Sequence, residues 1–142
     1  MNASTEPTDP EQVVREFLRR LADEPERALA LMDPAIEWRN SGAPTLRGAR
    51  VHQAIRGLAE SGVVGFGVEM THVAASGPIV ITQRTDVIEV GPVRTRFWVY
   101  GTFEVRHGKV LLWDDHFSWG AMLRSLAWGA LTAPLRTGAR RA

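Results

Sequence analysis

The spacing of apolar residues changes near Val63, and this change constrains the fold more than any other feature of the sequence. Before Val63, apolar side chains recur at the spacing of an amphipathic helix. After it, they alternate with polar side chains, as in half-buried strands. A chain with helices first and strands afterwards predicts an α+β domain, in which the helices pack on one face of a sheet.

The part before Val63 carries the signals of three helices and one short strand. The first helix begins at Asp9, a capping residue that is followed by Pro10 at the first helical position. Its apolar face is formed by Val14, Phe17, Leu18 and Leu21. The other expected elements are a helix over 25–32 that Asp33-Pro34 ends, a strand over 36–39, a loop over 40–44 and a helix over 49–60.

The part after Val63 predicts four strands and a final helix. The strands begin at residues 63, 79, 93 and 110, and glycine-containing turns at 76–77, 91–92 and 106–109 separate them. Such short turns favour antiparallel pairing of consecutive strands. Residues 118–135 have the pattern of an amphipathic helix. We expect this helix to close its own domain, and the alternatives are a helix that lies on a membrane or binds a partner.

Composition limits the classes of function. With 142 residues, we expect one domain over 9–135 between a flexible tail at 1–8 and a basic flexible tail at 136–142. A net charge of +1 gives no reason to expect a nucleic-acid partner. The absence of cysteine excludes disulfides, thiolate metal sites and a cysteine nucleophile. Neither a signal peptide nor a membrane span is expected, so we expect a soluble, cytoplasmic protein.

Common catalytic motifs are missing from the sequence. The four histidines have no metal-ligand spacing, and there is no nucleophile elbow, phosphate-binding loop or dinucleotide-binding fingerprint. We therefore expect neither a metal nor a cofactor.

Charged residues inside apolar strands are the remaining candidates for chemistry. Arg84 and Asp86 are two residues apart, so they share one face of a strand, and Asp115 shares a face with Trp113 and Phe117. A carboxylate between aromatic side chains is costly to bury unless it is paired, and Arg84 is the obvious partner. Two carboxyls that share one guanidinium in an apolar pocket can supply a general base and a general acid. A structural ion pair explains the pattern equally well.

Three short segments, in this order along the chain, resemble the limonene-1,2-epoxide hydrolase family. They are Trp38-Arg39-Asn40, Arg84-Thr85-Asp86 and Trp113-Asp114-Asp115-His116-Phe117. The resemblance extends roughly over residues 11–117 and is closest to the actinobacterial branch around residues 97–105. It implies the NTF2-like fold, a cone of N-terminal helices packed on a curved mixed, mainly antiparallel sheet, with a C-terminal helix.

The resemblance also implies an activity and a role for each motif residue. The reaction is a one-step, cofactor-independent addition of water to a small, mostly apolar epoxide, which gives a vicinal diol. Asp115 is the general base, Asp86 the general acid and Arg84 the bridge between them. Asn40 positions the water, and Trp38 replaces the family's water-binding Tyr. An indole N–H can donate a hydrogen bond but cannot accept one, so this replacement removes one acceptor from the water site.

Further expectations concern the pocket wall and the oligomer. The wall is expected to comprise Val80, Ile88, Phe97, Val99, Trp113 and Phe117. The family resemblance implies a homodimer through the outer face of the sheet, with Trp98 and Tyr100 at the interface; the alternative is that both pack under the helices. Two other functions stay open, an isomerase or cyclase of the same fold and a non-catalytic domain that binds a small ligand or a protein.

Overall fold

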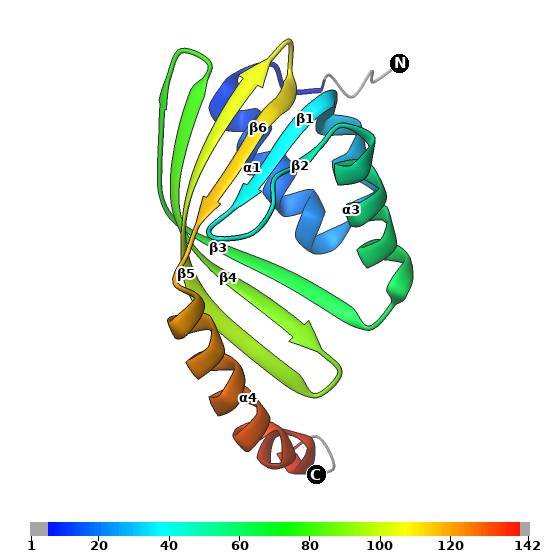
Figure 1. Ribbon diagram of the computed structural model, residues 1–142, viewed down its shortest axis with the longest axis vertical. Coiled ribbons are helices and arrows are strands. Elements are labelled where there is room, and N and C mark those ends of the chain that lie inside the picture. Colours follow the sequence, from blue (N-terminus) through cyan, green and yellow to red (C-terminus); the bar gives the residue numbers. More distant parts are fainter. Residues whose placement is uncertain (1–5, 140–142) are drawn as a thin grey trace.

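A computed structural model describes residues 6–139 of the chain and the side chains of residues 6–133 (Figure 1). Its helices are α1 (Pro10–Asp23), α2 (Pro25–Ala28), α3 (Ala49–Ser61) and α4 (Trp119–Ala139), with a 3-10 turn at Leu29–Leu31. Its strands are β1 (Met32–Asn40), β2 (Leu46–Arg47), β3 (Val64–Ser76), β4 (Ile79–Val90), β5 (Val93–Arg106) and β6 (Lys109–His116).

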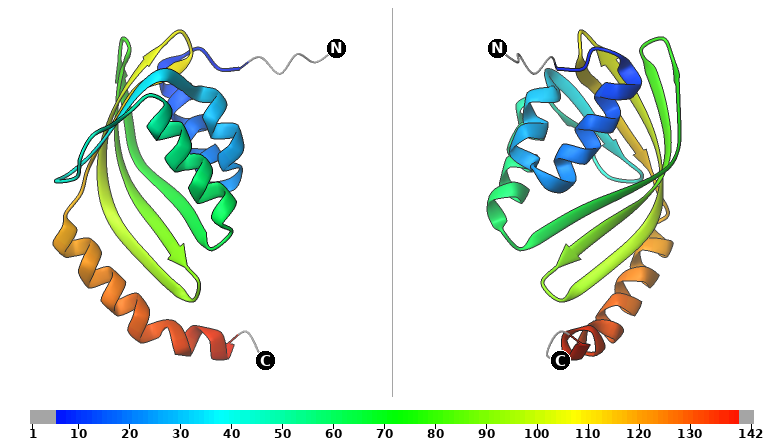
Figure 2. Two further views of the ribbon diagram at one scale, coloured as in Figure 1. Left: turned by 45° about the vertical axis from the view of Figure 1, so that its right-hand side comes forward. Right: turned by 180° about the vertical axis from the view of Figure 1, so that it is seen from behind.

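The described strands form one mixed sheet in the order β2-β1-β6-β5-β4-β3. Each of the strands β3, β4 and β5 pairs in antiparallel orientation with the next strand along the chain, as the short turns predict. Strand β1 pairs with β6 in parallel orientation. The sheet is strongly curved and open, and α1, α2 and α3 lie together on its inner side (Figure 2). This confirms the α+β class and the mixed, mainly antiparallel sheet.

The first helix begins and packs as predicted. The Asp9 side chain accepts a hydrogen bond from the Gln12 N–H at 3.2 Å, and Pro10 occupies the first turn. The apolar face of α1 is buried against the inner side of the sheet, where Phe17 meets Phe103 and Trp113 edge-on. This contact forms the centre of the core, next to the strands that carry the charged residues.

The helix expected over 25–32 ends earlier than predicted. After Ala28 the backbone tightens into the 3-10 turn, and Met32 is already extended and pairs with Val110. Asp33 and Pro34 therefore lie inside β1 rather than at the end of a helix. The register with β6 is irregular between Met32 and Glu37, because Pro34 has no N–H to donate to a neighbouring strand.

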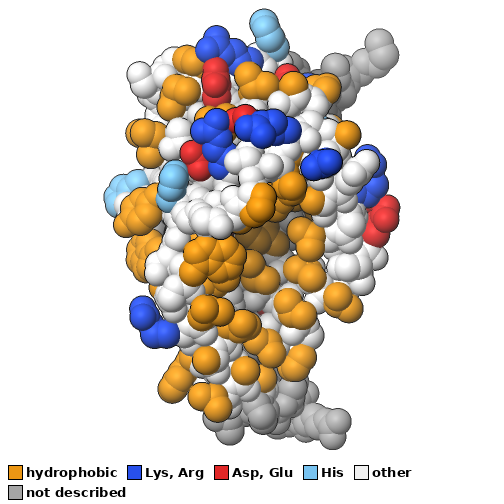
Figure 3. Space-filling model, viewed as in Figure 1, with side chains coloured by type: hydrophobic (Ala, Val, Ile, Leu, Met, Phe, Trp, Pro, Cys, Tyr) orange, Lys and Arg blue, Asp and Glu red, His pale blue; other side chains and the backbone are white. Residues whose placement is uncertain are grey.

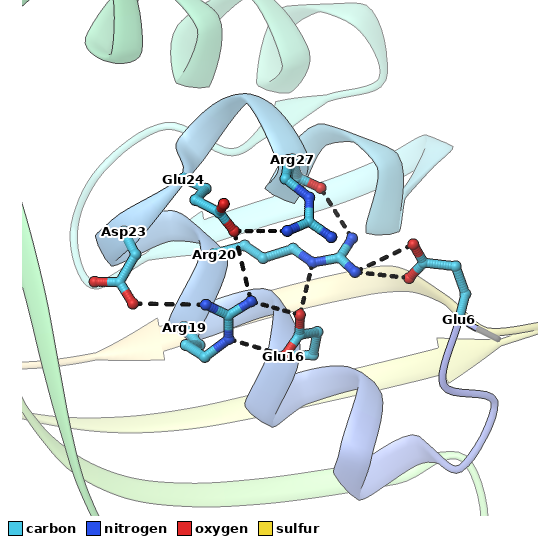
Figure 4. A network of polar contacts seen from close by, with 7 residues as sticks. All are labelled: Glu6, Glu16, Arg19, Arg20, Asp23, Glu24 and Arg27. Carbon is cyan, nitrogen blue, oxygen red and sulfur yellow. Dashed lines mark hydrogen bonds and ion pairs between the residues drawn. The ribbon is translucent and has the colours of Figure 1, made fainter. Parts of the chain in front are cut away.

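A network of ion pairs joins α1 and α2 to the segment that precedes them (Figure 4). The guanidinium of Arg20 is 5% exposed and pairs with both Glu6 and Glu16 at 2.9 Å, and it also donates to the Arg27 carbonyl. Glu6 belongs to the stretch expected to be a flexible tail, but this pair holds it against α1. Residues 1–5 of that stretch lie outside the described residues.

Helix α4 covers an edge of the sheet. Only the second half of β5, from Tyr100 onward, pairs with β6, so the first half has a free edge. Ser125 accepts a hydrogen bond from the Arg96 backbone N–H at 2.8 Å, and Gly129 lies so close to the Arg94 carbonyl that a Cβ there would clash. The last helix therefore contacts the sheet of its own domain, but Leu123, Leu126 and Leu131 of the expected apolar face are exposed.

This helix is also longer than predicted. It continues to Ala139, into the stretch expected to be a tail, and residues 140–142 lie outside the described part. The outward face of α4 exposes Leu123, Leu126, Trp128 and Leu131. None of the described helices is long and apolar enough to cross a membrane.

Candidate active site

A cavity of about 510 Å³ lies between the inner side of the sheet and the helices. Hydrophobic side chains surround a hollow on the face of the molecule seen in Figure 3. The cavity wall is mostly apolar and is lined by residues of all four helices and five strands. A cavity of this size is typical of sites for small organic ligands.

Five of the six residues expected in the wall line this cavity, namely Ile88, Phe97, Val99, Trp113 and Phe117. Val80 does not line it and is fully buried in the hydrophobic core opposite Phe103. It lies two residues before Thr82 on the inner face of β4, where α1 and the core cover the sheet. Trp119 and Met122 of α4 also line the cavity, and they were not expected there.

Arg84, Asp86 and Asp115 form one buried cluster at the cavity wall. Arg84 is fully buried and donates to Asp86 through Nε at 2.8 Å and Nη2 at 3.1 Å. The same Nη2 pairs with Asp115 Oδ2 at 2.8 Å. Both carboxyl groups line the cavity, and they are 4% and 5% exposed. One guanidinium therefore bridges two carboxyls that face the same space.

Strand register brings this cluster together. Gly101 of β5 pairs with Thr82 of β4 on one side and with Asp115 of β6 on the other. A Cβ at Gly101 would collide with Arg84 Nη1, and it would lie 2.7 Å from Thr82 Oγ1 and 2.9 Å from Phe103. The missing side chain thus leaves the space through which Arg84 reaches Asp115.

Gly101 and Thr82 were missed by the sequence analysis. Thr82 is fully buried and accepts a hydrogen bond from Arg84 Nη1 at 3.1 Å, so it holds the third nitrogen of the guanidinium. The available signal was a glycine inside an alternating strand, which often marks a close approach of another group. Its meaning depends on strand register, which the sequence does not give.

The two oxygens of Asp115 have different surroundings. Oδ2 pairs with Arg84 and accepts a hydrogen bond from Trp113 Nε1 at 2.8 Å. Oδ1 is buried and has no hydrogen-bond partner among the described residues, and the same holds for Trp38 Nε1. Both residues belong to the cavity wall, so an acceptor and a donor without partners among the described residues lie in the same wall. Such a pair suits a polar ligand or a water molecule.

Trp38 and Asn40 of β1 lie next to these groups. The ring of Trp38 stacks on that of Trp113, with centroids 4.5 Å apart, and Asn40 is the parallel neighbour of Asp115. Ser41 fixes the end of β1, because its N–H donates to the Asp115 carbonyl and its Oγ accepts from the Phe117 N–H, each at 3.1 Å. Both Trp38 and Asn40 line the cavity, so the structure brings all five motif residues to one place.

Burial alters the protonation of the two carboxyls. It raises the pKa of Asp86 above its ordinary value and that of Asp115 to about 6, and the charge of Arg84 opposes both changes. The pKa of Arg84 is also raised: burial lowers it, but the neighbouring charges of Asp115 and Asp86 prevail. Since one cation cannot neutralise two carboxylates, an apolar site of this kind favours one shared proton.

Two neighbours of Asp115 on β6 point away from the cavity. Asp114 and His116 pair with each other at 3.3 Å on the outer face of the sheet, where Asp114 also approaches Arg39. Their difference from the family motif therefore does not reach the cavity. Within the described part of the chain, no group of three His, Asp or Glu side chains converges as a metal site.

Comparisons with known proteins agree with one another. The family model of the limonene-1,2-epoxide hydrolase catalytic domain matches residues 8–128. Epoxide hydrolase EphG of Mycobacterium tuberculosis is 36% identical over 124 residues, which cover 85% of this chain and 83% of that protein.

Solved structures give the same result. The structure of an LEH-like epoxide hydrolase from M. tuberculosis superposes with a TM-score of 0.84 at 33% identity, over 92% of this chain and 98% of the other. A putative polyketide cyclase from Xanthomonas campestris has a TM-score of 0.68 at 11% identity, over 80% and 93% of the two chains. The second similarity shows a common fold alone.

Proposed function

Because the chain belongs to the limonene-1,2-epoxide hydrolase family, we propose that it adds water to a small, mostly apolar epoxide and releases a vicinal diol. One observation carries this proposal. Two buried carboxyls joined by a single guanidinium face an apolar cavity, and one carboxylate oxygen of Asp115 is left without a partner among the described residues. Buried polar atoms normally have a hydrogen-bond partner, so the unpaired oxygen points to a water molecule or a polar ligand.

The reaction needs no covalent intermediate in this arrangement. Asp115 accepts a proton from a water molecule through Oδ1 while the water oxygen bonds to one ring carbon. The bond between that carbon and the epoxide oxygen breaks, and Asp86 gives its proton to that oxygen. Arg84 holds both carboxyls and stabilises the charge as it passes from one to the other. The turnover leaves the proton on Asp115, so it must return to Asp86 before the next one.

Trp38 and Asn40 suit the attacking water. Its two protons point to Asp115 Oδ1 and to the amide oxygen of Asn40, and its oxygen accepts a hydrogen bond from the Trp38 N–H. One lone pair then remains for the ring carbon. The indole N–H of Trp38, which can only donate, is therefore compatible with catalysis in place of the family's Tyr, because Asp115 and Asn40 accept both protons of the water.

We also propose a homodimer through the outer face of the sheet. Trp98 and Tyr100 alternate with Phe97 and Val99 along β5 and are each 54% exposed, on the face opposite the helices. Two exposed aromatic side chains side by side on a strand suit a protein interface.

Incubation with a panel of terpene, cyclohexene and styrene oxides tests the proposed function. Diol is measured by chiral gas chromatography, with Asp115→Asn as the matched variant, because Asn keeps the shape of the carboxyl and cannot act as a base. We expect diol from the native protein only. If neither protein forms diol from any epoxide, the proposal fails in favour of an isomerase or a ligand-binding domain. Equal diol from both would disprove the role of Asp115.

A further inference from the structure

Trp113 is held tightly against the proposed base. Its indole N–H donates to Asp115 Oδ2 at 2.8 Å, and the side chain is 4% exposed. The ring stacks on Trp38 at 4.5 Å, and Phe17 packs edge-on against it at 5.1 Å. With one neighbour on its face and another packed edge-on, the ring has little freedom to turn, so the direction of the N–H is fixed.

The proposed mechanism needs an asymmetry that Arg84 does not supply. Asp115 must be ionised and Asp86 protonated before the reaction. Yet Arg84 makes two contacts with Asp86, at 2.8 and 3.1 Å, and a single contact with Asp115 at 2.8 Å. Judged by the guanidinium alone, Asp86 is the carboxyl that loses its proton more easily. Another group must reverse this preference.

We infer that the indole N–H of Trp113 determines which of the two carboxyls holds their shared proton. It adds a second donor to Asp115, whereas the described residues give Asp86 no donor besides Arg84. A hydrogen bond to a carboxylate stabilises its ionised form, so this donor opposes the burial that raises the pKa of Asp115 and favours the proton on Asp86. The inference rests on the proposed function and makes Trp113 a positioning residue rather than only a part of the pocket wall.

Trp113 has a second effect on Asp115. With Oδ2 occupied by Arg84 and Trp113, Oδ1 is the oxygen of Asp115 without a partner among the described residues. The base therefore presents one defined oxygen to the water. Loss of the N–H would free Oδ2 to compete for that water and would loosen the carboxyl about its terminal torsion, which is intrinsically soft.

Few other charges face this pair. Among the described residues that line the cavity, Asp86 and Asp115 are the titratable ones, and Arg84 lies behind them. Strand β1 adds the uncharged Trp38 and Asn40, and the helices add mainly apolar side chains. Asp114 and His116 lie on the opposite face of the sheet. The acidic limb of a pH–rate profile therefore reports on the pair itself, which titrates as a coupled unit.

The first test replaces Trp113 by Phe, which keeps an aromatic ring and removes the N–H. We expect the midpoint of the acidic limb of kcat/KM to move upward by about one pH unit, because ionised Asp115 loses a donor. At pH 6 the shift of the limb alone lowers the rate about fivefold. The plateau at higher pH also falls, because the distribution of one shared proton between two carboxyls does not depend on pH. Simple damage to the fold would lower the rate equally at every pH.

Two companion variants make the test decisive. Site-specific replacement of Trp113 by benzothienylalanine changes the N–H to sulfur and keeps the shape of the ring, so it answers the question if Trp113→Phe does not fold. Phe17→Leu removes the edge-on contact with Trp113 but leaves the N–H. We expect this control to lower the melting temperature without moving the acidic limb.

The outcomes separate this inference from the proposed function. An acidic limb that moves in the two Trp113 variants and not in Phe17→Leu supports it. If the native protein forms diol and Asp115→Asn does not, but neither Trp113 variant moves the limb, the inference is wrong and the proposed function stands. If the native protein forms no diol from any epoxide, both are overturned.

Discussion

Gly101 lies where β5 passes between the strands that carry Arg84 and Asp115, and its missing side chain is as important to the site as the charges themselves. A Cβ there would collide with the guanidinium, Thr82 and Phe103, all of which are buried. Buried groups in a close-packed core have little room to yield.

We therefore predict that Gly101→Ala displaces Arg84 and lowers kcat/KM by about a hundredfold or more, since a displacement of about 1 Å can have an effect of that size. The matched control is Gly67→Ala on β3, where an added Cβ would make an ordinary 3.5 Å contact with Val87 outside the cavity. Diol formation measured for both variants checks the prediction. Equal rates would show that Arg84 tolerates the extra carbon.

Trp38 offers a second test at the residue scale. Tyr at this position would give the water a hydroxyl that both donates and accepts. We predict that Trp38→Tyr forms diol at a rate no lower than that of the native protein. A large loss, measured as kcat at saturating epoxide, would contradict the proposed water site and would assign Trp38 to substrate binding.

The sequence predicted the residues of the site better than the way they are held. Spacing along β4 and β6 put Arg84 and Asp86 on one face and Asp115 beside Trp113 and Phe117, because strand periodicity is a local property. The roles of Gly101 and Thr82 depend on the register among three strands. Val80 was misassigned because the same face of β4 turns from the cavity toward the core along its length.

At the scale of elements, the junction of α1 and α2 depends on Arg20. Its guanidinium is buried, so its removal takes one of two arginine donors from Glu16 and leaves the Arg27 carbonyl without its side-chain donor. We predict that Arg20→Ala lowers the free energy of unfolding by about 2 kcal/mol, less than for a fully buried pair because Glu6 and Glu16 are partly exposed. Arg19→Ala is the control: that side chain is 47% exposed, and we expect a smaller effect because solvent screens its ion pairs.

Urea denaturation at two pH values tests the electrostatic part of this prediction. Hydrogen bonds from Arg19 and Arg20 lower the pKa of Glu16 to about 2, although its partial burial acts in the opposite direction. The folded state therefore binds fewer protons than the unfolded state between the two pKa values. The contribution of Glu16 is complete above about pH 4.5 and is lost as the pH falls toward 2. The difference between the native protein and Arg20→Ala should therefore be smaller at pH 3 than at pH 7, and an unchanged difference would contradict this account.

The elements differ in how well the sequence predicted them. Helix α1, helix α3 and the four-strand meander carry strong local signals, and they were predicted to within a few residues. The end of α2 was wrong because Pro34, which usually follows a helix, lies inside β1. Strand β2 was missed because two residues, Leu46 and Arg47, carry no periodicity, and they form a strand only by pairing with β1.

At the scale of the whole molecule, the outer face of the sheet leads to a prediction about assembly. Trp98→Asp should convert the proposed homodimer to a monomer, because a charge would be buried without a partner at the interface. Val63→Asp is the control, since Val63 is exposed beside the edge strand β3. Sedimentation velocity of the two variants and the native protein measures the result. A native protein that is monomeric at micromolar concentration would disprove the dimer.

The central claim is that Asp86, Arg84 and Asp115 add water directly to an epoxide, and a single turnover in H₂¹⁸O tests it most directly. With enzyme in excess over epoxide, mass spectrometry of the diol shows where the new oxygen came from. The account predicts one ¹⁸O atom in the diol from the native protein and no diol from Asp115→Asn. Diol that carries only ¹⁶O in this first turnover would mean that a carboxylate oxygen attacked the ring, and it would contradict the account.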